Sequence, residues 1–136
     1  MSNIKTYNKS RSIKYLGIDY GEKRIGLALA DSETKIATPF KVVSSPEEIA
    51  KIVVDEVIDM LIVGKPYQIS NSQFPIAKQF TNFINDLKTK IKIPIEFIDE
   101  RLSSKAADAR SGNRKTKAPR DAVAAMIILQ SYLDRA

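Results

Sequence analysis

The sequence contains no cysteine and no histidine, and both absences restrict the chemistry open to the chain. Without cysteine there is no disulfide, no thiolate zinc site and no cysteine nucleophile, which suits a reducing cytosol. Without histidine, the usual general base of enzymes and the triad chemistries are missing as well. Any hydrolysis must therefore depend on carboxylates, on lysine, or on water bound to a metal ion.

Long apolar runs are missing too. No run reaches the roughly 18–20 residues that span a bilayer, so we expect no membrane segment. The basic N-terminal residues are not followed by the apolar stretch of a secretory signal. At 136 residues, 43% of them apolar, the chain suits one domain with a substantial core. We predict a disordered basic tail over residues 1–13 and a single domain over residues 14–136.

Positive charge exceeds negative charge and is concentrated in two segments. The formal net charge is +6. Residues 101–120 hold seven basic side chains against the single acid Asp108, and residues 1–14 hold four more. Such clusters suit a polyanion, most simply nucleic acid, although a solvated loop that keeps the protein soluble would have the same composition.

Three strand patterns open the chain. They cover Lys14–Asp19, Arg24–Ala30 and Ile36–Val43, and the short connections between them predict antiparallel pairing. Both faces of the second strand are apolar, so it should be internal. We expect a helix to pack closely over its small-residue face, which consists of Gly26, Ala28 and Ala30.

Helices and strands alternate after that point. Ser45, Pro46 and Glu48 form the capping signature of a helix. Strand patterns follow at Met60–Val63 and Ile95–Asp99, and their long connections predict parallel pairing. The fold class is therefore α/β, with a mixed five-stranded sheet and helices on both faces. The other predicted elements are a helix presenting Ile76, Phe80, Phe83, Ile84 and Leu87 on one face, a short helix over Ser103–Ala109, a loop over Arg110–Ala118 and a helix over Pro119–Leu133.

Three acidic positions are candidates for a metal site. Asp19 ends the first strand and should lie at the mouth of the sheet, because an unpaired buried carboxylate costs several kcal/mol. Asp99 and Glu100 end the last strand and point to opposite faces, so periodicity alone does not decide which one faces Asp19. Asp121 begins the last helix, where the helix dipole favours any acid. Each position also has a plain structural interpretation, as a turn residue, an ion-pair partner or a dipole partner.

An ordered set of motifs resembles one known family. These are the YqgF-type Holliday-junction-resolvase-like nucleases, also described as pre-16S rRNA nucleases. The match runs from about Tyr15 to Asp134. The segments that carry it are Asp19-Tyr20-Gly21-Glu22-Lys23-Arg24-Ile25-Gly26, Ala37-Thr38-Pro39, Val63-Gly64-Lys65-Pro66, Asp99-Glu100-Arg101-Leu102-Ser103-Ser104 and Asp121-Ala122-Val123-Ala124-Ala125.

The resemblance implies a ribonuclease-H-like fold, a cytoplasmic location and a two-metal hydrolase that matures the 5′ end of 16S rRNA. It also implies a catalytic, metal-binding trio of Asp19, Glu100 and Asp121, with Asp99 as the second choice for the strand-end ligand. Oxygen ligands favour Mg²⁺ or Mn²⁺ over zinc. Metal-bound water would explain hydrolysis without histidine. The residues expected to bind nucleic acid are Lys23, Arg24, Arg101, Lys105, Arg114, Lys115 and Lys117.

Two segments depart from the family pattern. The stretch between Ser104 and Asp121 is shorter than is usual and lacks a leucine-bearing helix often found there. The loop after Pro66 lacks the glycine common in relatives, which suggests a stiffer substrate loop.

Three other interpretations remain open at this point. A Holliday-junction DNA resolvase would normally be a symmetric dimer, and no apolar stripe in the sequence demands one, so we expect a monomer. A non-catalytic nucleic-acid-binding factor in transcription or ribosome assembly would use the same basic segment. An ATP-handling module, suggested by Gly17, Asp19 and Gly21, would need a longer chain.

Overall fold

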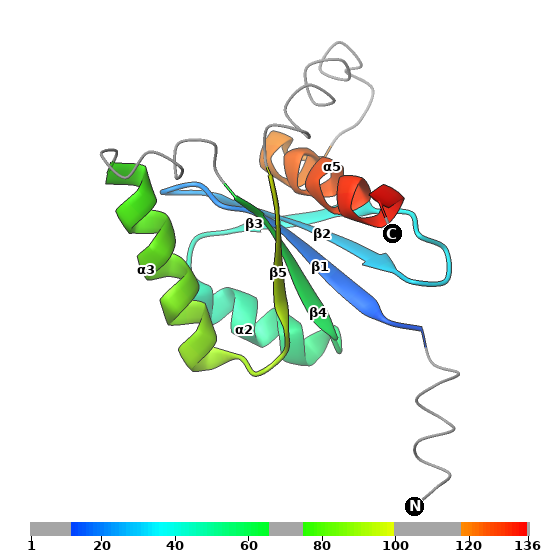
Figure 1. The fold of residues 1–136 in the computed structure, drawn as a ribbon, viewed down its shortest axis with the longest axis horizontal. Coiled ribbons are helices and arrows are strands. Elements are labelled where there is room, and N and C mark those ends of the chain that lie inside the picture. The colour runs from blue at the N-terminus through cyan, green and yellow to red at the C-terminus, as the bar shows by residue number, and fades with distance from the viewer. Residues whose placement is uncertain (1–11, 66–74, 100–117, 136) are drawn as a thin grey trace, which may run out of the picture.

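The computed structural model describes residues 12–65, 75–99 and 118–135 (Figure 1). The predicted tail therefore lies outside the described residues, except for Ser12 and Ile13. The predicted short helix over residues 103–109 and the predicted loop over residues 110–118, apart from Ala118, also lie outside them.

Five strands form one mixed sheet, and they are β1 (Lys14–Asp19), β2 (Ile25–Asp31), β3 (Thr38–Val43), β4 (Met60–Lys65) and β5 (Ile95–Asp99). Their spatial order is β3-β2-β1-β4-β5. β2 pairs antiparallel with β1 and β3, whereas β4 pairs parallel with β1 and β5. The predicted mixture of antiparallel and parallel pairing is confirmed.

The predicted third strand began two residues too early. The pattern suggested a strand from Ile36, and β3 begins at Thr38. Before that point Ala37 donates its backbone N–H to Gln130 Oε1 at 2.8 Å. This stretch of chain therefore bonds to a helix side chain instead of joining the ladder with β2, and Ile36 remains 64% exposed.

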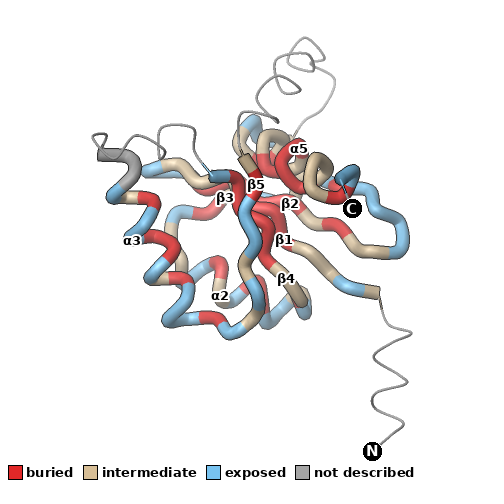
Figure 2. The backbone as a smooth tube through the Cα atoms, viewed as in Figure 1, coloured by how far each residue is buried: buried red, intermediate tan, exposed pale blue. Residues whose placement is uncertain are grey.

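Helices cover both faces of the sheet, as predicted. α2 (Pro46–Asp55) and α3 (Pro75–Lys90) lie on one face, and α5 (Arg120–Arg135) lies on the other (Figure 1). Figure 2 shows buried residues in both layers. Within the described residues, no helix has the length and apolar character needed to cross a membrane. The core under α2 and α3 includes Leu16, Ile18, Leu61 and Phe83, and the core under α5 includes Ala28, Ile62, Ile128 and Leu129.

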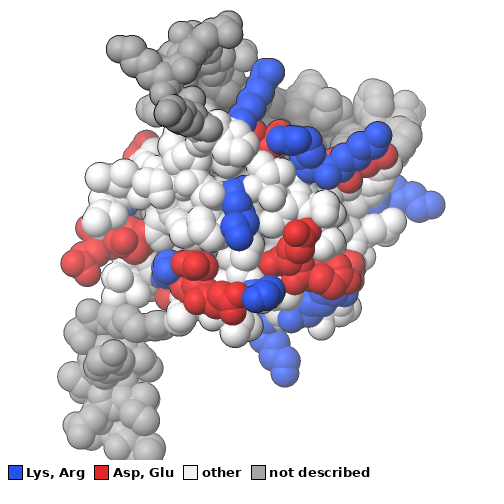
Figure 3. Space-filling view, turned by 180° about the vertical axis from the view of Figure 1, so that it is seen from behind, with Lys and Arg blue, Asp and Glu red and all other residues white. Residues whose placement is uncertain are grey.

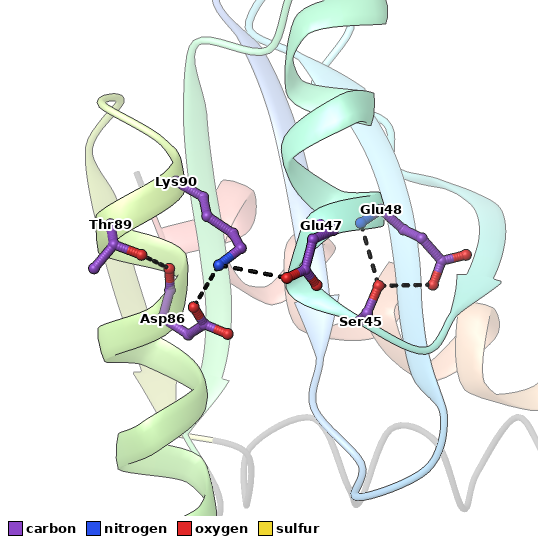
Figure 4. Close-up of polar contacts among 6 residues, drawn as sticks. All are labelled: Ser45, Glu47, Glu48, Asp86, Thr89 and Lys90. Atoms are coloured by element: carbon purple, nitrogen blue, oxygen red, sulfur yellow. Dashed lines mark hydrogen bonds and ion pairs between the residues drawn. The ribbon is translucent and has the colours of Figure 1, made fainter.

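Helix α2 begins with the predicted cap (Figure 4). Ser45 Oγ accepts the N–H of Glu48 at 3.4 Å, and Pro46 takes the first helical position. The Glu48 carboxylate in turn accepts the N–H of Ser44 at 2.8 Å. That bond, more than the others from Ser44 and Ser45, holds the pKa of Glu48 below its usual value. The cap fixes the point at which the chain turns from β3 into α2.

Lys90 connects the two helices on this face (Figure 4). Its Nζ lies 2.6 Å from Asp86 Oδ1 in α3 and 3.5 Å from Glu47 Oε2 in the first turn of α2. The bond to Asp86, above all, raises the pKa of Lys90. Thr89 donates its hydroxyl to the carbonyl of Asp86 at 2.6 Å, at the end of the same helix.

Helix α2 ends with a valine in a position where glycine is usual. The N–H of Ile58 donates to the carbonyl of Val53 at 3.0 Å, and the N–H of Val57 donates to that of Val54 at 3.2 Å. This is the hydrogen-bond pattern of a Schellman motif. Val57 has a φ of 55° and is 58% exposed. A β-branched residue in this left-handed conformation costs about 1–3 kcal/mol.

We expect Val57→Gly to raise the free energy of unfolding by about 1 kcal/mol, because glycine adopts the left-handed conformation without steric cost. The matched control is Val54→Gly, at a 75% exposed position inside α2. There the same change should lower stability by about 0.5–1 kcal/mol. Urea unfolding of both variants measures the difference. Destabilisation of equal size in both would show that Val57 is not strained.

Candidate active site

Helix α5 approaches the sheet closely because glycines line its path. A methyl group built on Gly17 would lie 2.7 Å from Cβ of Leu129. A methyl group on Gly26 would overlap the backbone carbonyl of Asp121. The close approach predicted for the small-residue face of the second strand is therefore confirmed.

Asp19 and Asp121 come to the same end of the sheet. Asp19 is the partner of Gly26 in the β1–β2 ladder, and such partners lie about 4.5–5.5 Å apart at Cα. Asp121, in the first turn of α5, rests on that same Gly26. Asp19 also shares a face of β1 with Gly17, which faces α5. The backbones of two of the acidic residues selected from the sequence therefore lie close together where β1, β2 and α5 join.

Arg24 connects the β1–β2 turn to the helix. Its Nε donates to Asp121 Oδ2 at 2.6 Å, with the two side chains 63% and 35% exposed. The residues are 97 positions apart. The sequence predicts a nucleic-acid-binding role for Arg24 but not this ion pair, because no spacing rule links positions so distant. A positive charge therefore lies beside a predicted metal ligand.

Tyr20 lies on the other face of the sheet from Asp19. Its ring centroid is 5.7 Å from that of Phe80 and 4.7 Å from that of Phe83, both in α3. Since neighbouring strand residues alternate, this supports the assignment of Asp19 to the α5 face. Burial, and then the charge of Glu22, raises the pKa of Tyr20. Its hydroxyl stays protonated at neutral pH and does not act as a general base there.

The last strand shows which face Asp99 occupies. Ile98 is 3% exposed and packs in the core under α5, whereas Phe97 contacts Phe80 of α3. Alternation therefore places Asp99 with Phe97 on the α3 face, opposite to the face of Asp19. Glu100 lies outside the described residues.

The predicted metal ligands are described only in part, since Asp19 and Asp121 are described and Glu100 is not. Accordingly, residues 12–65, 75–99 and 118–135 contain no group of three His, Cys, Asp or Glu residues arranged to hold a metal ion. The two aspartates offer hard oxygen donors of the kind that Mg²⁺ and Mn²⁺ prefer. The pair fits such an ion and needs at least one further ligand.

Lys23 and Arg24 are the two predicted nucleic-acid-binding residues that the structure describes. Basic and acidic residues nearly balance over the described part of the chain. Figure 3 shows them intermixed on the back of the molecule. The excess positive charge of the sequence therefore comes from the segments outside it. The remaining predicted residues, Arg101, Lys105, Arg114, Lys115 and Lys117, lie in those segments.

Comparison with known proteins identifies the family. Residues 13–135 match the family model described as RuvX: Holliday junction resolvase. The chain belongs to the RuvX family. A "Putative pre-16S rRNA nuclease" of Maridesulfovibrio salexigens is 35% identical over 135 residues, covering 91% of this chain and 100% of the relative. A protein of the same name from Chloroflexus aggregans is 38% identical over 130 residues, covering 88% of this chain and 92% of the relative. The family resemblance seen in the motifs is confirmed.

Solved structures confirm the fold expected of a RuvX family member. The chain is similar to T. thermophilus RuvC in complex with Holliday junction substrate, with a TM-score of 0.64 and 14% identity over 90% of this chain and 94% of that one. A second Thermus thermophilus RuvC structure gives a TM-score of 0.59 and 12% identity over 90% and 95% of the two chains. The predicted ribonuclease-H-like fold is therefore correct.

We expect Gly26→Ala to lower the free energy of unfolding by about 1–3 kcal/mol, because the added methyl group meets the backbone of Asp121 and α5 must shift. The matched control is Gly64→Ala, whose methyl group would lie 2.5 Å from Cδ1 of Ile128, the end of a flexible side chain. That variant should lose less. Thermal unfolding of both variants measures the difference. Equal losses would contradict a tight backbone contact at Gly26.

Proposed function

We propose that this protein is a metal-dependent nuclease that hydrolyses phosphodiester bonds. The observation that supports the proposal is that Asp19 is the ladder partner of Gly26 and that the backbone of Asp121 packs on the same Gly26, at one end of a ribonuclease-H-like sheet. Membership of a family described by nuclease activity supports the same reaction. The absence of histidine and cysteine from the sequence leaves carboxylates and bound metal as its natural chemistry.

Asp19 and Asp121 would hold the metal together with Glu100. Glu100 is the better candidate for the third ligand, because Asp99 belongs to the α3 face of the sheet. The donors suit Mg²⁺ or Mn²⁺. When bound, a pair of such ions would supply an activated water and stabilise the charge on the leaving oxygen.

Other side chains would position the substrate. Arg24 lies against Asp121, so it can hold this carboxylate in place and also attract a phosphate. Lys23 precedes it in the same turn. Lysine and arginine contacts with phosphates give sequence-tolerant, salt-dependent binding. We assign this role also to Arg101, Lys105, Arg114, Lys115 and Lys117.

The substrate we propose is precursor 16S rRNA, cut near its 5′ end in the cytoplasm. Two relatives are named as pre-16S rRNA nucleases, which supports this choice. A four-way DNA junction is the second candidate, because the family model is described as a Holliday junction resolvase. Incubating the purified protein with precursor rRNA, a matched DNA junction and duplex DNA, each with Mn²⁺ or with EDTA, separates the two. Cleavage of none of them would leave only a nucleic-acid-binding factor.

We expect Asp19→Asn to reduce metal-dependent cleavage about 100-fold or more, because a metal ligand is lost while the shape of the side chain is kept. RNA binding in EDTA should be nearly unchanged. The matched control is Asp31→Asn, at the end of β2, which should cleave like the parent. Gel assays of initial cleavage rates compare the variants. A normal rate for Asp19→Asn would show that this residue is not catalytic.

We expect Arg24→Gln to tighten Mn²⁺ binding by up to about five-fold, because the arginine competes with the metal for Asp121. An exposed ion pair is worth about 0–1 kcal/mol, which sets that limit. Lys23→Gln removes the same charge one residue away and should have a smaller effect. Isothermal titration with Mn²⁺ measures both. Weaker metal binding by Arg24→Gln would show that Arg24 supports the metal-binding conformation of Asp121 instead of competing for it.

A further inference from the structure

A hollow of about 230 Å³ lies between α3 and β5, on the face of the sheet opposite to α5. It is smaller than most small-molecule pockets, which measure roughly 300–1,000 Å³. β5 is the edge strand of the described sheet, with β4 as its one neighbour in the strand order. The residues that line it are Lys65, Phe80, Thr81, Ile84, Asn85, Lys88 and Phe97.

Phe97 forms an exposed aromatic surface in this hollow. Its side chain is 43% exposed, although Phe97 lies in the middle of β5 between the apolar residues Ile95 and Ile98. Phe80 packs against it with ring centroids 6.2 Å apart and an interplanar angle of 66°. The contact holds the Phe97 ring while leaving part of it open to solvent. An exposed, anchored aromatic ring is the platform on which proteins stack unpaired nucleic-acid bases.

Apart from Asp99, which lies two residues further along β5 on the same face, the polar groups around the ring are cationic or neutral. Thr81, Asn85 and Lys88 are exposed and follow one another at i, i+4 and i+7, so they form one polar stripe along α3. Lys65 contributes a second ammonium group from the end of β4, and no acidic residue lines the hollow. Asp99 is the neighbour of Lys65 in the β4–β5 register, so a carboxylate side chain leaves the sheet on the same face beside that lysine. Lys88 is therefore the cation that can most readily meet a phosphate.

One end of the hollow lies at the end of the sheet that carries Asp19. Lys65 is the last residue of β4, and β4 runs parallel to β1, which ends at Asp19. The hollow therefore reaches the Asp19 end of the sheet at Lys65, extends away from it along α3 to Lys88, and lies on the opposite face from the Asp19–Asp121 site. A strand bound in the hollow would reach the site by passing around that end.

We propose that this hollow binds single-stranded nucleic acid, with one unpaired base stacked on Phe97, its edge hydrogen-bonded by Asn85 or Thr81, and a flanking phosphate on Lys88. The site rests on the proposed function for its ligand class, and it adds a single-stranded segment to the substrate. It would hold a segment of the substrate at a distance from the reacting bond, without taking part in the reaction. Duplex nucleic acid does not offer such a base, because its bases are already stacked.

Phe97→Trp tests this directly, because the sequence contains no tryptophan and the variant has a single indole fluorophore. A single-stranded RNA of about ten nucleotides, within the range that such sites cover, is titrated in EDTA so that no cleavage occurs. We expect saturable quenching of the indole fluorescence. The midpoint of the quenching curve should equal the midpoint of binding measured separately by fluorescence anisotropy of labelled RNA. Val54→Trp, on the 75% exposed position of α2, is the matched control and should not be quenched.

Substitutions then separate stacking from charge. Phe97→Leu keeps an apolar contact with Phe80 but removes the ring, and should weaken single-strand binding on the order of ten-fold, whereas Phe97→Tyr should bind like the parent. Lys88→Gln should lower the slope of log affinity against log salt by about 0.7. Duplex RNA binding should be the same in all three variants.

The outcomes distinguish this site from the proposed reaction. If the parent cleaves RNA with Mn²⁺ but Phe97→Leu binds single strands normally, the hollow is not a binding site and the nuclease proposal stands. If RNA quenches the fluorescence of Phe97→Trp and the parent never cleaves, the binding site stands and the nuclease proposal fails. Concentration-dependent self-association that Phe97→Leu abolishes would assign this face to a second copy of the chain and overturn the proposal.

Discussion

The close approach of α5 to the sheet is the constraint on which the candidate site depends. Large side chains under a helix hold it away from a sheet, whereas Gly17 and Gly26 have no side chain at the points where this helix comes closest. Ala122 and Ala125 on the helix are fully buried and add little thickness. The first turn of α5 can therefore pack directly against the end of β1 and the start of β2. A bulkier residue along that row would move the helix and its acid away from Asp19 together.

The two faces of the sheet accordingly differ in the side chains that they bury and in their polar groups. Under α2 and α3 the core is made of large aliphatic and aromatic side chains, which supply most of the apolar burial. The core under α5 is thinner and includes several alanines. Its polar end carries the ion pair between Arg24 and Asp121, whose side chains are 63% and 35% exposed. Such a pair contributes little to stability, so its partners can be exchanged at small cost.

Local patterns in the sequence predicted most of the fold. The cap at Ser45, the strand at Lys14–Asp19 and the small-residue face of β2 all depend on near neighbours, and the structure has each of them. Features that depend on distant contacts were not accessible. The start of β3 depends on Gln130, and the partner of Arg24 is 97 residues away. The face of the sheet on which Asp99 lies could be assigned only once the helix covering each side of β5 was known.

The order of the elements along the chain has a consequence for how the protein is made. Asp19 belongs to the first of the described strands along the chain, while Asp121 belongs to a helix synthesised after every other described element. At roughly 5–20 residues per second, the chain spends several seconds with only part of its acidic site in existence. A nascent chain therefore cannot assemble this site before α5 emerges and docks. Premature termination ahead of α5 would yield a fragment that lacks Asp121 and therefore this site.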